Sequence, residues 1–123
     1  MSSMIERLVE ALTHEFANEV VFQPFMPATL TIPSVVVSPG DPFLIPATHG
    51  MVEERWDVLV AVAMKDGGSG ILQMRDLSLR VLRATVSVGG IWREASGPRR
   101  LTDDRQSVVS SNTISFRYQP PTI

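Results

Sequence analysis

The stretch from Glu53 to Met64, EERWDVLVAVAM, constrains the fold more than any other part of the sequence. Its residues alternate between two sides and include aromatic and β-branched types, so the period of two predicts a β-strand. The polar end, from Glu53 to Asp57, is expected to reach water. From Val58 onward both sides are apolar, which is typical of a strand covered on both faces. Helices are expected to cover one face, and another subunit is a candidate for the second.

Composition narrows the class of protein. The 123 residues are 44% apolar and 20% charged, an ordinary balance for a single globular domain over residues 1–123. There is no cysteine and there are only two histidines, so one chain cannot supply several nitrogen or sulfur ligands to a transition metal. We therefore expect no metal, no organic cofactor and no catalytic activity. No run of about 18 apolar residues occurs, so no membrane-spanning segment is predicted.

Two helices are predicted. The first runs from about Ser3 to Ala17, because Ser3 and Glu6 form a capping box. Its apolar residues recur at helical spacing and form one stripe. The second runs from Ile71 to about Val86, after a turn over residues 65–70 that contains glycines. The spacing of these glycines is not that of a phosphate-binding loop, so nucleotide binding is not predicted there.

The outward face of the second helix carries two leucines, Leu72 and Leu79, among arginines that include Arg75 and Arg83. Scattered exposed leucines are common and need no explanation. Leucine flanked by arginine also suits the rim of an interface. Both interpretations stay open.

The segment from Pro24 to Pro46 holds six of the nine prolines and is predicted to be extended rather than helical. One short strand fits within it, from Ser34 to Ser38, and Pro39 to Pro42 has the composition of a turn. Two apolar groups lie between prolines, Phe25-Met26 and Phe43-Leu44-Ile45. The segment either folds over the edge of the core or forms a contact arm for a neighbouring subunit.

The last third of the chain predicts two more strands, Ile91 to Ala95 and Gln106 to Tyr118, separated by a mixed-charge loop with Arg99 and Arg100. Val109, Ser111, Thr113, Ser115 and Arg117 form a face of the last strand that is expected to be solvated. The element order is therefore α-β-β-α-β-β. It predicts an α+β fold with two helices packed on one face of a four-stranded, mostly antiparallel sheet. The other face is expected to lack cover from the chain itself.

Three segments, taken in order, resemble a known family. They are VVVSPGDPFLIPATHG from Val35 to Gly50, the strand WDVLVAVAM that follows, and the helix ILQMRDLSLRVLRAT. In this order they are similar to tail terminator, or tail-completion, proteins of long-tailed, non-contractile bacteriophages. The resemblance covers most of the chain, and none of its motifs contains a catalytic residue. The chain departs from typical members in the turn before the second helix and in the final strand.

The resemblance implies a structural virion protein at the head-proximal end of the tail tube. Such proteins form a ring, usually a hexamer, that stops tube polymerisation and provides the surface joining tail to head. The implied partners are further copies of the chain, the tail-tube protein and the head-connector protein. The implied location is the virion tail, and the host cytoplasm during assembly. Minor head–tail joining proteins are similar in size and remain an alternative.

DNA is expected to meet the protein only as passing cargo. The net charge is −2, lysine occurs once, and ten arginines are interleaved with thirteen acidic residues. Proteins that hold DNA usually present clustered positive charge.

The expected contacts with a neighbouring subunit or partner are Phe25, Met26, Phe43, Leu44, Ile45, Leu72, Arg75, Leu79 and Arg83.

Two further classes stay open: a small oligomeric α+β adaptor and a small enzyme. An enzyme would have to use His49, Glu53, Glu54 and Asp57. General acid–base catalysis requires such groups within hydrogen-bond reach of one another or of the substrate. The sequence does not arrange these four residues as a recognisable acid–base pair.

Overall fold

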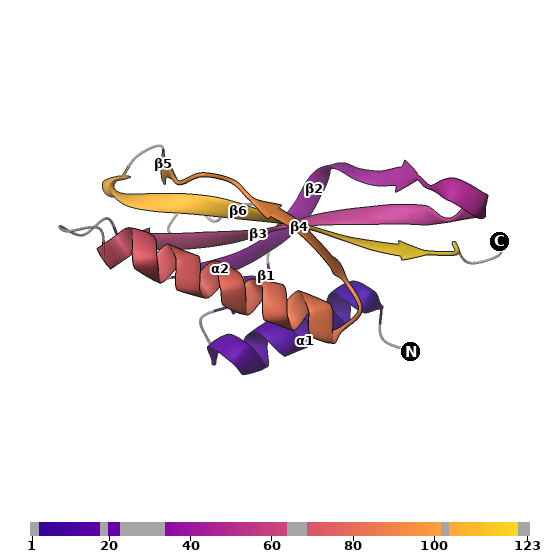
Figure 1. Ribbon diagram of the computed structural model, residues 1–123, viewed down its shortest axis with the longest axis horizontal. Coiled ribbons are helices and arrows are strands. Elements are labelled where there is room, and N and C mark those ends of the chain that lie inside the picture. The colour runs from indigo at the N-terminus through magenta and orange to yellow at the C-terminus, as the bar shows by residue number, and fades with distance from the viewer. Residues whose placement is uncertain (1–2, 18–19, 23–33, 64–68, 102–103, 121–123) are drawn as a thin grey trace.

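A computed structural model describes residues 3–17, 20–22, 34–63, 69–101 and 104–120. Two helices lie on one face of a twisted sheet (Figure 1). Four antiparallel strands make up most of that sheet. In spatial order they are β2 (Ser34–Pro46), β3 (Val52–Ala63), β6 (Asp104–Tyr118) and β4 (Ile91–Ala95). The predicted α+β fold is confirmed.

Two three-residue strands extend this sheet. β1 (Val20–Phe22) runs parallel to β2 at one edge, and β5 (Arg99–Leu101) pairs with β6. The prediction that Arg99 and Arg100 belong to a loop is therefore wrong. A short 3-10 helix, η1 (Thr48–Gly50), connects β2 to β3.

Helix α1 (Met4–Phe16) begins where its capping residues predict. The Ser3 hydroxyl accepts a hydrogen bond from the Glu6 backbone N–H at 3.2 Å and donates one to Glu6 Oε1 at 2.9 Å. The first of these bonds satisfies one of the backbone donors that a helix start leaves without a partner. The apolar stripe of α1 faces the sheet, with Leu8, Leu12 and Phe16 buried.

Helix α2 (Ser69–Ser87) ends in a Schellman motif. Gly89 adopts a positive φ of 80°, a conformation that glycine adopts without steric cost. Its N–H donates to the Val86 carbonyl, and the Gly90 N–H donates to the Thr85 carbonyl. A Cβ on Gly90 would lie 2.7 Å from the Phe116 ring, so a larger residue does not fit where β4 begins.

Arg80 ties the two helices together. Its guanidinium donates to the Glu15 carboxylate at 3.1 Å and to the Glu15 carbonyl at 2.7 Å. It also lies 4.4 Å from the centre of the Phe16 ring. Arg80 is therefore half-buried between the helices, unlike Arg75 and Arg83 of the same helix, which are exposed.

The main core lies between the helices and the sheet. Strand β3 contributes every second residue to this core: Trp56, Val58, Val60 and Val62. The polar side chain of Asn112, in β6, is fully buried there. Its amide donates to the Val58 carbonyl and accepts from the Trp92 indole at 3.0 Å, so the buried polar atoms have partners.

The opposite face of the sheet carries a second, smaller core of Val36, Leu59, Ala61 and Val109, all buried within the single chain. The expectation that this face lacks cover is therefore wrong. The solvated face predicted for the last strand is wrong at two positions, because Val109 and Ser115 are also buried. An apolar second side on β3 consequently gives no evidence for a partner subunit.

The turn predicted at Pro39 to Pro42 is also wrong, because β2 continues through it with a bulge. The pairing with β3 shifts register between Pro39 and Leu44, and the Asp41–Pro42 peptide is cis. A Cβ on Gly40 would lie 3.0 Å from Arg55, so the backbones approach closely here. Beyond the bulge, β2 and β3 project past the helices as an arm, residues 39–56, with the end of β6 beside it (Figure 1).

Candidate functional site

Two separate surfaces expose large apolar side chains. The first is on the arm, where Phe43 is 37% exposed and Leu44 is 51% exposed. The Phe43 ring lies edge-on to the buried Trp56, with ring centres 5.1 Å apart. This contact holds Phe43 in place while leaving part of it open to solvent. Ile45, the third residue of the predicted apolar group, is only half-buried and lies on the other face of the arm, paired with Glu53.

The second surface is a stripe along the outer face of α2. Leu72, Leu79 and Val86 are 66%, 45% and 61% exposed, and we call these three residues the α2 stripe. Their spacing of seven residues keeps them on one side of the helix. Sequence reasoning identified the two leucines but missed Val86, although it continues the same spacing. Arg75 and Arg83 are exposed on the same helix, as expected.

Not every predicted contact residue can be located. Phe25 and Met26 lie outside the described residues. The remaining seven fall into the arm group and the α2 group, and the structure does not bring these two groups together within one chain. Figure 1 shows the tip of the arm at the opposite end of the molecule from the first turn of α2.

A third feature lies on the sheet face turned away from the helices, around Glu53. Glu53 was expected to reach water, yet its side chain is only 3% exposed. It accepts hydrogen bonds from Arg55 Nε at 2.8 Å, from Arg117 Nε at 3.1 Å and from Arg93. We call these four residues the Glu53 cluster. They border a hollow of about 430 Å³, whose other wall runs from Ile45 to Thr48.

Two strand irregularities build this cluster. The pairing of β4 with β6 shifts between Trp92 and Glu94, which leaves Arg93 as an extra residue. Such a bulge can redirect a side chain, and Arg93 reaches across to Glu53 and to the Ser115 hydroxyl at 3.1 Å. The bulge in β2 lies opposite Arg55, the next arginine of the cluster.

The charge of Glu53 is strongly favoured by these neighbours. Burial raises the pKa of its carboxyl, but hydrogen bonds from Arg55 and Arg117 and the charge of Arg93 outweigh burial. The resulting pKa is below the usual value, so Glu53 is ionised at neutral pH. Three guanidinium groups around one carboxylate leave two positive charges in excess.

A second hollow, of about 380 Å³, adjoins the cluster along β3 and shares Arg55 with it. Its carboxylates come from Asp41, Asp57 and Glu94, and Arg99 is its other base. Burial raises the pKa of Asp57, while hydrogen bonds from Ser111 and Thr113 oppose that rise. The face therefore carries an excess of positive charge beside an excess of negative charge.

The residues proposed for an enzyme do not converge. Glu54 lies on the opposite side of β3 from Glu53, where it accepts from the Trp56 indole at 2.6 Å and the Tyr118 hydroxyl at 2.7 Å. The hydrogen bond between Tyr118 and Glu54, together with burial and the negative charge of Glu54, raises the pKa of Tyr118 to about 12. His49 is exposed in η1. In the described part of the chain no three His, Cys, Asp or Glu side chains are grouped so as to hold a metal ion.

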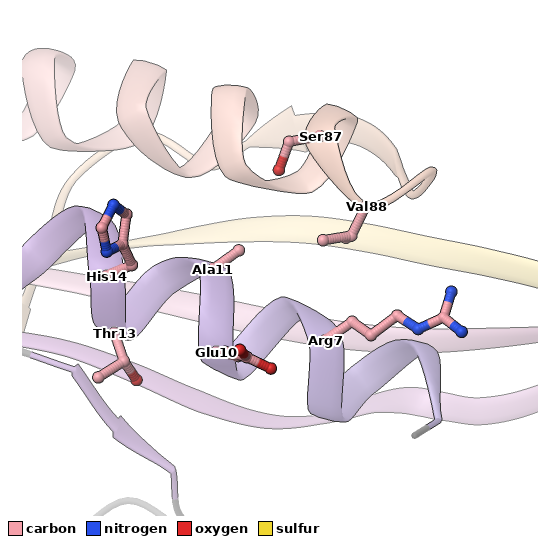
Figure 2. A pocket seen from close by; sticks show the side chains of 7 residues that line it. All are labelled: Arg7, Glu10, Ala11, Thr13, His14, Ser87 and Val88. Carbon is pink, nitrogen blue, oxygen red and sulfur yellow. The ribbon is translucent and has the colours of Figure 1, made fainter. Parts of the chain in front are cut away.

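A groove of about 840 Å³ lies between α1 and the end of α2 (Figure 2). Ala11 and Val88 point toward one another across it, and His14 and Arg7 line it from α1. The two hydroxyls in its lining donate to helix carbonyls, Thr13 to Val9 and Ser87 to Ala84. Glu10 and His14 also line the groove, but no hydrogen bond joins either of them to these hydroxyls among the described residues, so neither hydroxyl is arranged as an activated nucleophile.

No family model matches the chain, and no curated protein matches it. Among the described residues, no helix has both the length and the apolar character needed to cross a bilayer.

Proposed function

We propose that this protein is a structural subunit that assembles head-to-tail into a ring. The observation that carries the proposal is the presence of two unlike exposed apolar surfaces, Phe43 and Leu44 on the arm and the α2 stripe. A surface that pairs with itself gives a two-fold dimer, whereas two different surfaces that pair with each other give a ring or a filament. The tip of the arm lies at the opposite end of the molecule from the first turn of α2, which suits contacts with two different neighbours.

The more specific form of the proposal is a tail terminator of a long-tailed, non-contractile bacteriophage. It rests on the sequence resemblance from Val35 through the second helix. In this role the ring, usually of six copies, sits on the last ring of the tail tube, stops tube polymerisation and offers a surface to the head connector. The protein acts without catalysis, metal or cofactor, in the virion tail and, before that, in the host cytoplasm.

The arrangement of side chains supports a non-enzymatic role. The acidic groups available to an enzyme, Glu53 and Glu54, point to opposite sides of β3, and each is bound by its own donors. A head–tail joining protein, or another small oligomeric adaptor, would use the same kind of surfaces. These alternatives differ from a terminator in the partner that is bound.

The test is a tube-growth assay with purified tail-tube protein. Addition of the chain should stop elongation and leave a shorter, narrower distribution of tube lengths, because the ring occupies the growing end. Binding to the head connector without any effect on tube length would instead favour a joining protein. Submicromolar binding to duplex DNA at physiological salt, with no effect on tubes, would contradict the proposal, because the net charge of −2 predicts no such affinity.

A further inference from the structure

We infer that the hollow bordered by the Glu53 cluster binds a carboxylate group from another polypeptide, held by Arg55, Arg93 and Arg117. These arginines come from three strands, β3, β4 and β6, and converge on one point of the sheet face. Arginine–carboxylate hydrogen bonds are among the strongest in proteins, because both partners are charged and the guanidinium can offer two parallel N–H groups.

The cluster has binding capacity left after its internal bonds are made. Each guanidinium carries five N–H donors. Within the described part of the chain, Glu53 and Ser115 accept only four of the N–H groups of the three arginines. The two positive charges in excess of Glu53 are not balanced inside the cluster, so a second carboxylate would be favourable there.

Glu53 acts as a positioning residue in this site. It accepts from all three arginines and thereby fixes their guanidinium planes before any ligand arrives. A preordered cluster binds with a smaller loss of side-chain entropy than three free arginines would. The side chains of Arg55 and Arg93 are about one-third exposed and that of Arg117 is 51% exposed, so a ligand can reach them.

The surroundings favour a single carboxylate of a polypeptide over the phosphates of a nucleic acid. The adjoining hollow, with Asp41, Asp57 and Glu94, would repel a long polyanion laid along this face. The opposite wall, from Ile45 to Ala47, offers apolar and neutral groups that suit the aliphatic part of an acidic side chain. A carboxylate on a peptide side chain is short enough to avoid the acidic hollow and has an aliphatic part that can pack against this wall. A DNA backbone has neither property.

This inference adds a partner chemistry and does not rest on ring formation. The hollow borders the arm on the side of Ile45 and Glu53, whereas Leu44 of the proposed ring contact is paired with Glu54 on the other side. The experiment titrates the full chain, with its arginine side chains labelled for NMR, with a capped tripeptide that has a central glutamate. The same tripeptide with glutamine, inorganic phosphate and a short DNA duplex serve as the other probes. The signals of Arg55, Arg93 and Arg117 Nε–Hε groups report occupancy.

We expect the glutamate peptide to shift these three signals with a Kd on the order of 1 mM, and the glutamine peptide to leave them in place. Arg117→Gln should weaken binding by about tenfold, the effect of losing one charged hydrogen bond. Arg117→Lys keeps the positive charge but loses the paired N–H donors of the guanidinium. Its affinity for the glutamate peptide should lie between those of the wild type and Arg117→Gln. Arg7→Gln, at an exposed arginine on α1, should leave binding unchanged.

Unchanged signals at saturating peptide would overturn the inference and leave the cluster as an internal ion-pair network. Tighter binding of phosphate or duplex DNA than of the glutamate peptide would overturn it in favour of a phosphate site. If Arg117→Gln does not fold, the wild-type titrations with the four probes still decide between these outcomes. A chain that binds the peptide yet never assembles would refute the ring and keep the carboxylate site.

Discussion

Glu53 shows how a buried charge is stabilised by residues distant in sequence. Its partners lie 2, 40 and 64 positions away, at Arg55, Arg93 and Arg117. Glu53→Gln should lower the free energy of unfolding at pH 7 by about 2 kcal/mol, because charged hydrogen bonds are replaced by neutral ones. Chemical denaturation measures the change. Glu94→Gln, at an exposed acid on β4, should change stability by less than about 0.5 kcal/mol.

The same residue predicts a pH dependence. Because the folded pKa of Glu53 is lowered, its stabilising contribution is present above the unfolded value of about 4.3 and is lost as pH falls through the folded value. The stability difference between the wild type and Glu53→Gln should therefore shrink below pH about 4. A difference that stays constant from pH 7 to pH 3 would show that Glu53 contributes little through its charge.

The sequence could not predict this cluster, and the reason is physical. Local polarity indicated that Glu53 to Asp57 would face water, which is usual for consecutive charged residues at a strand end. The burial of Glu53 depends on Arg93, and Arg93 reaches it only because a bulge in β4 redirects the side chain. A single extra residue in a short strand has no signature in composition or periodicity.

At the scale of elements, periodicity predicted both helices, β3 and β4 closely. Ser3 was correctly identified as the cap of α1 because its chemistry is local. The errors concern segments in which proline, glycine and aspartate occur together. Pro39 to Pro42 has the composition of a turn, but the same residue types also suit a bulge in a strand. Only the pairing with β3, a long-range contact, distinguishes the two.

The arm gives a direct test of the contact surfaces. Phe43→Ser combined with Leu44→Ser should abolish or strongly weaken assembly, because both side chains supply exposed apolar area. The cost to monomer stability should stay near 1 kcal/mol, mainly from the lost ring contact with Trp56. Light scattering and thermal unfolding measure the two effects. Ile91→Ser, a similar change on β4 outside both surfaces, is the matched control and should assemble normally.

If the arm variant melts far below the wild type but assembles once folded, then Phe43 and Leu44 serve the core rather than an interface. If Ile91→Ser disrupts assembly equally, the effect is not specific to the arm.

The two unlike surfaces make a sharper prediction when variants are mixed. The arm variant keeps an intact α2 stripe, and a Leu72→Ser, Leu79→Ser variant keeps an intact arm. In a head-to-tail contact each variant alone should remain monomeric, whereas an equimolar mixture should form a heterodimer and stop there. Native mass spectrometry distinguishes these species. Homodimers of either variant, or no complex in the mixture, would show that the arm and the α2 stripe do not pair with one another.

In the molecule as a whole, the surfaces available for assembly are exposed side chains rather than an uncovered sheet face. The second apolar side of β3 is buried inside the chain, as Leu59 and Ala61 demonstrate. The arm and the α2 stripe carry five of the exposed large apolar side chains of the described residues, and Ile71 and Ile91 are exposed outside them. The weakly negative net charge is consistent with a ring through which DNA passes without being held.

Ring formation at the growing end of the tube can be seen by electron microscopy of tube ends after tail-tube protein has been mixed with an excess of this chain. We expect a closed ring at one end of each capped tube, with six copies resolved in end-on class averages. Bare tube ends, together with a strictly monomeric mass by light scattering at high concentration in the same mixture, would contradict it.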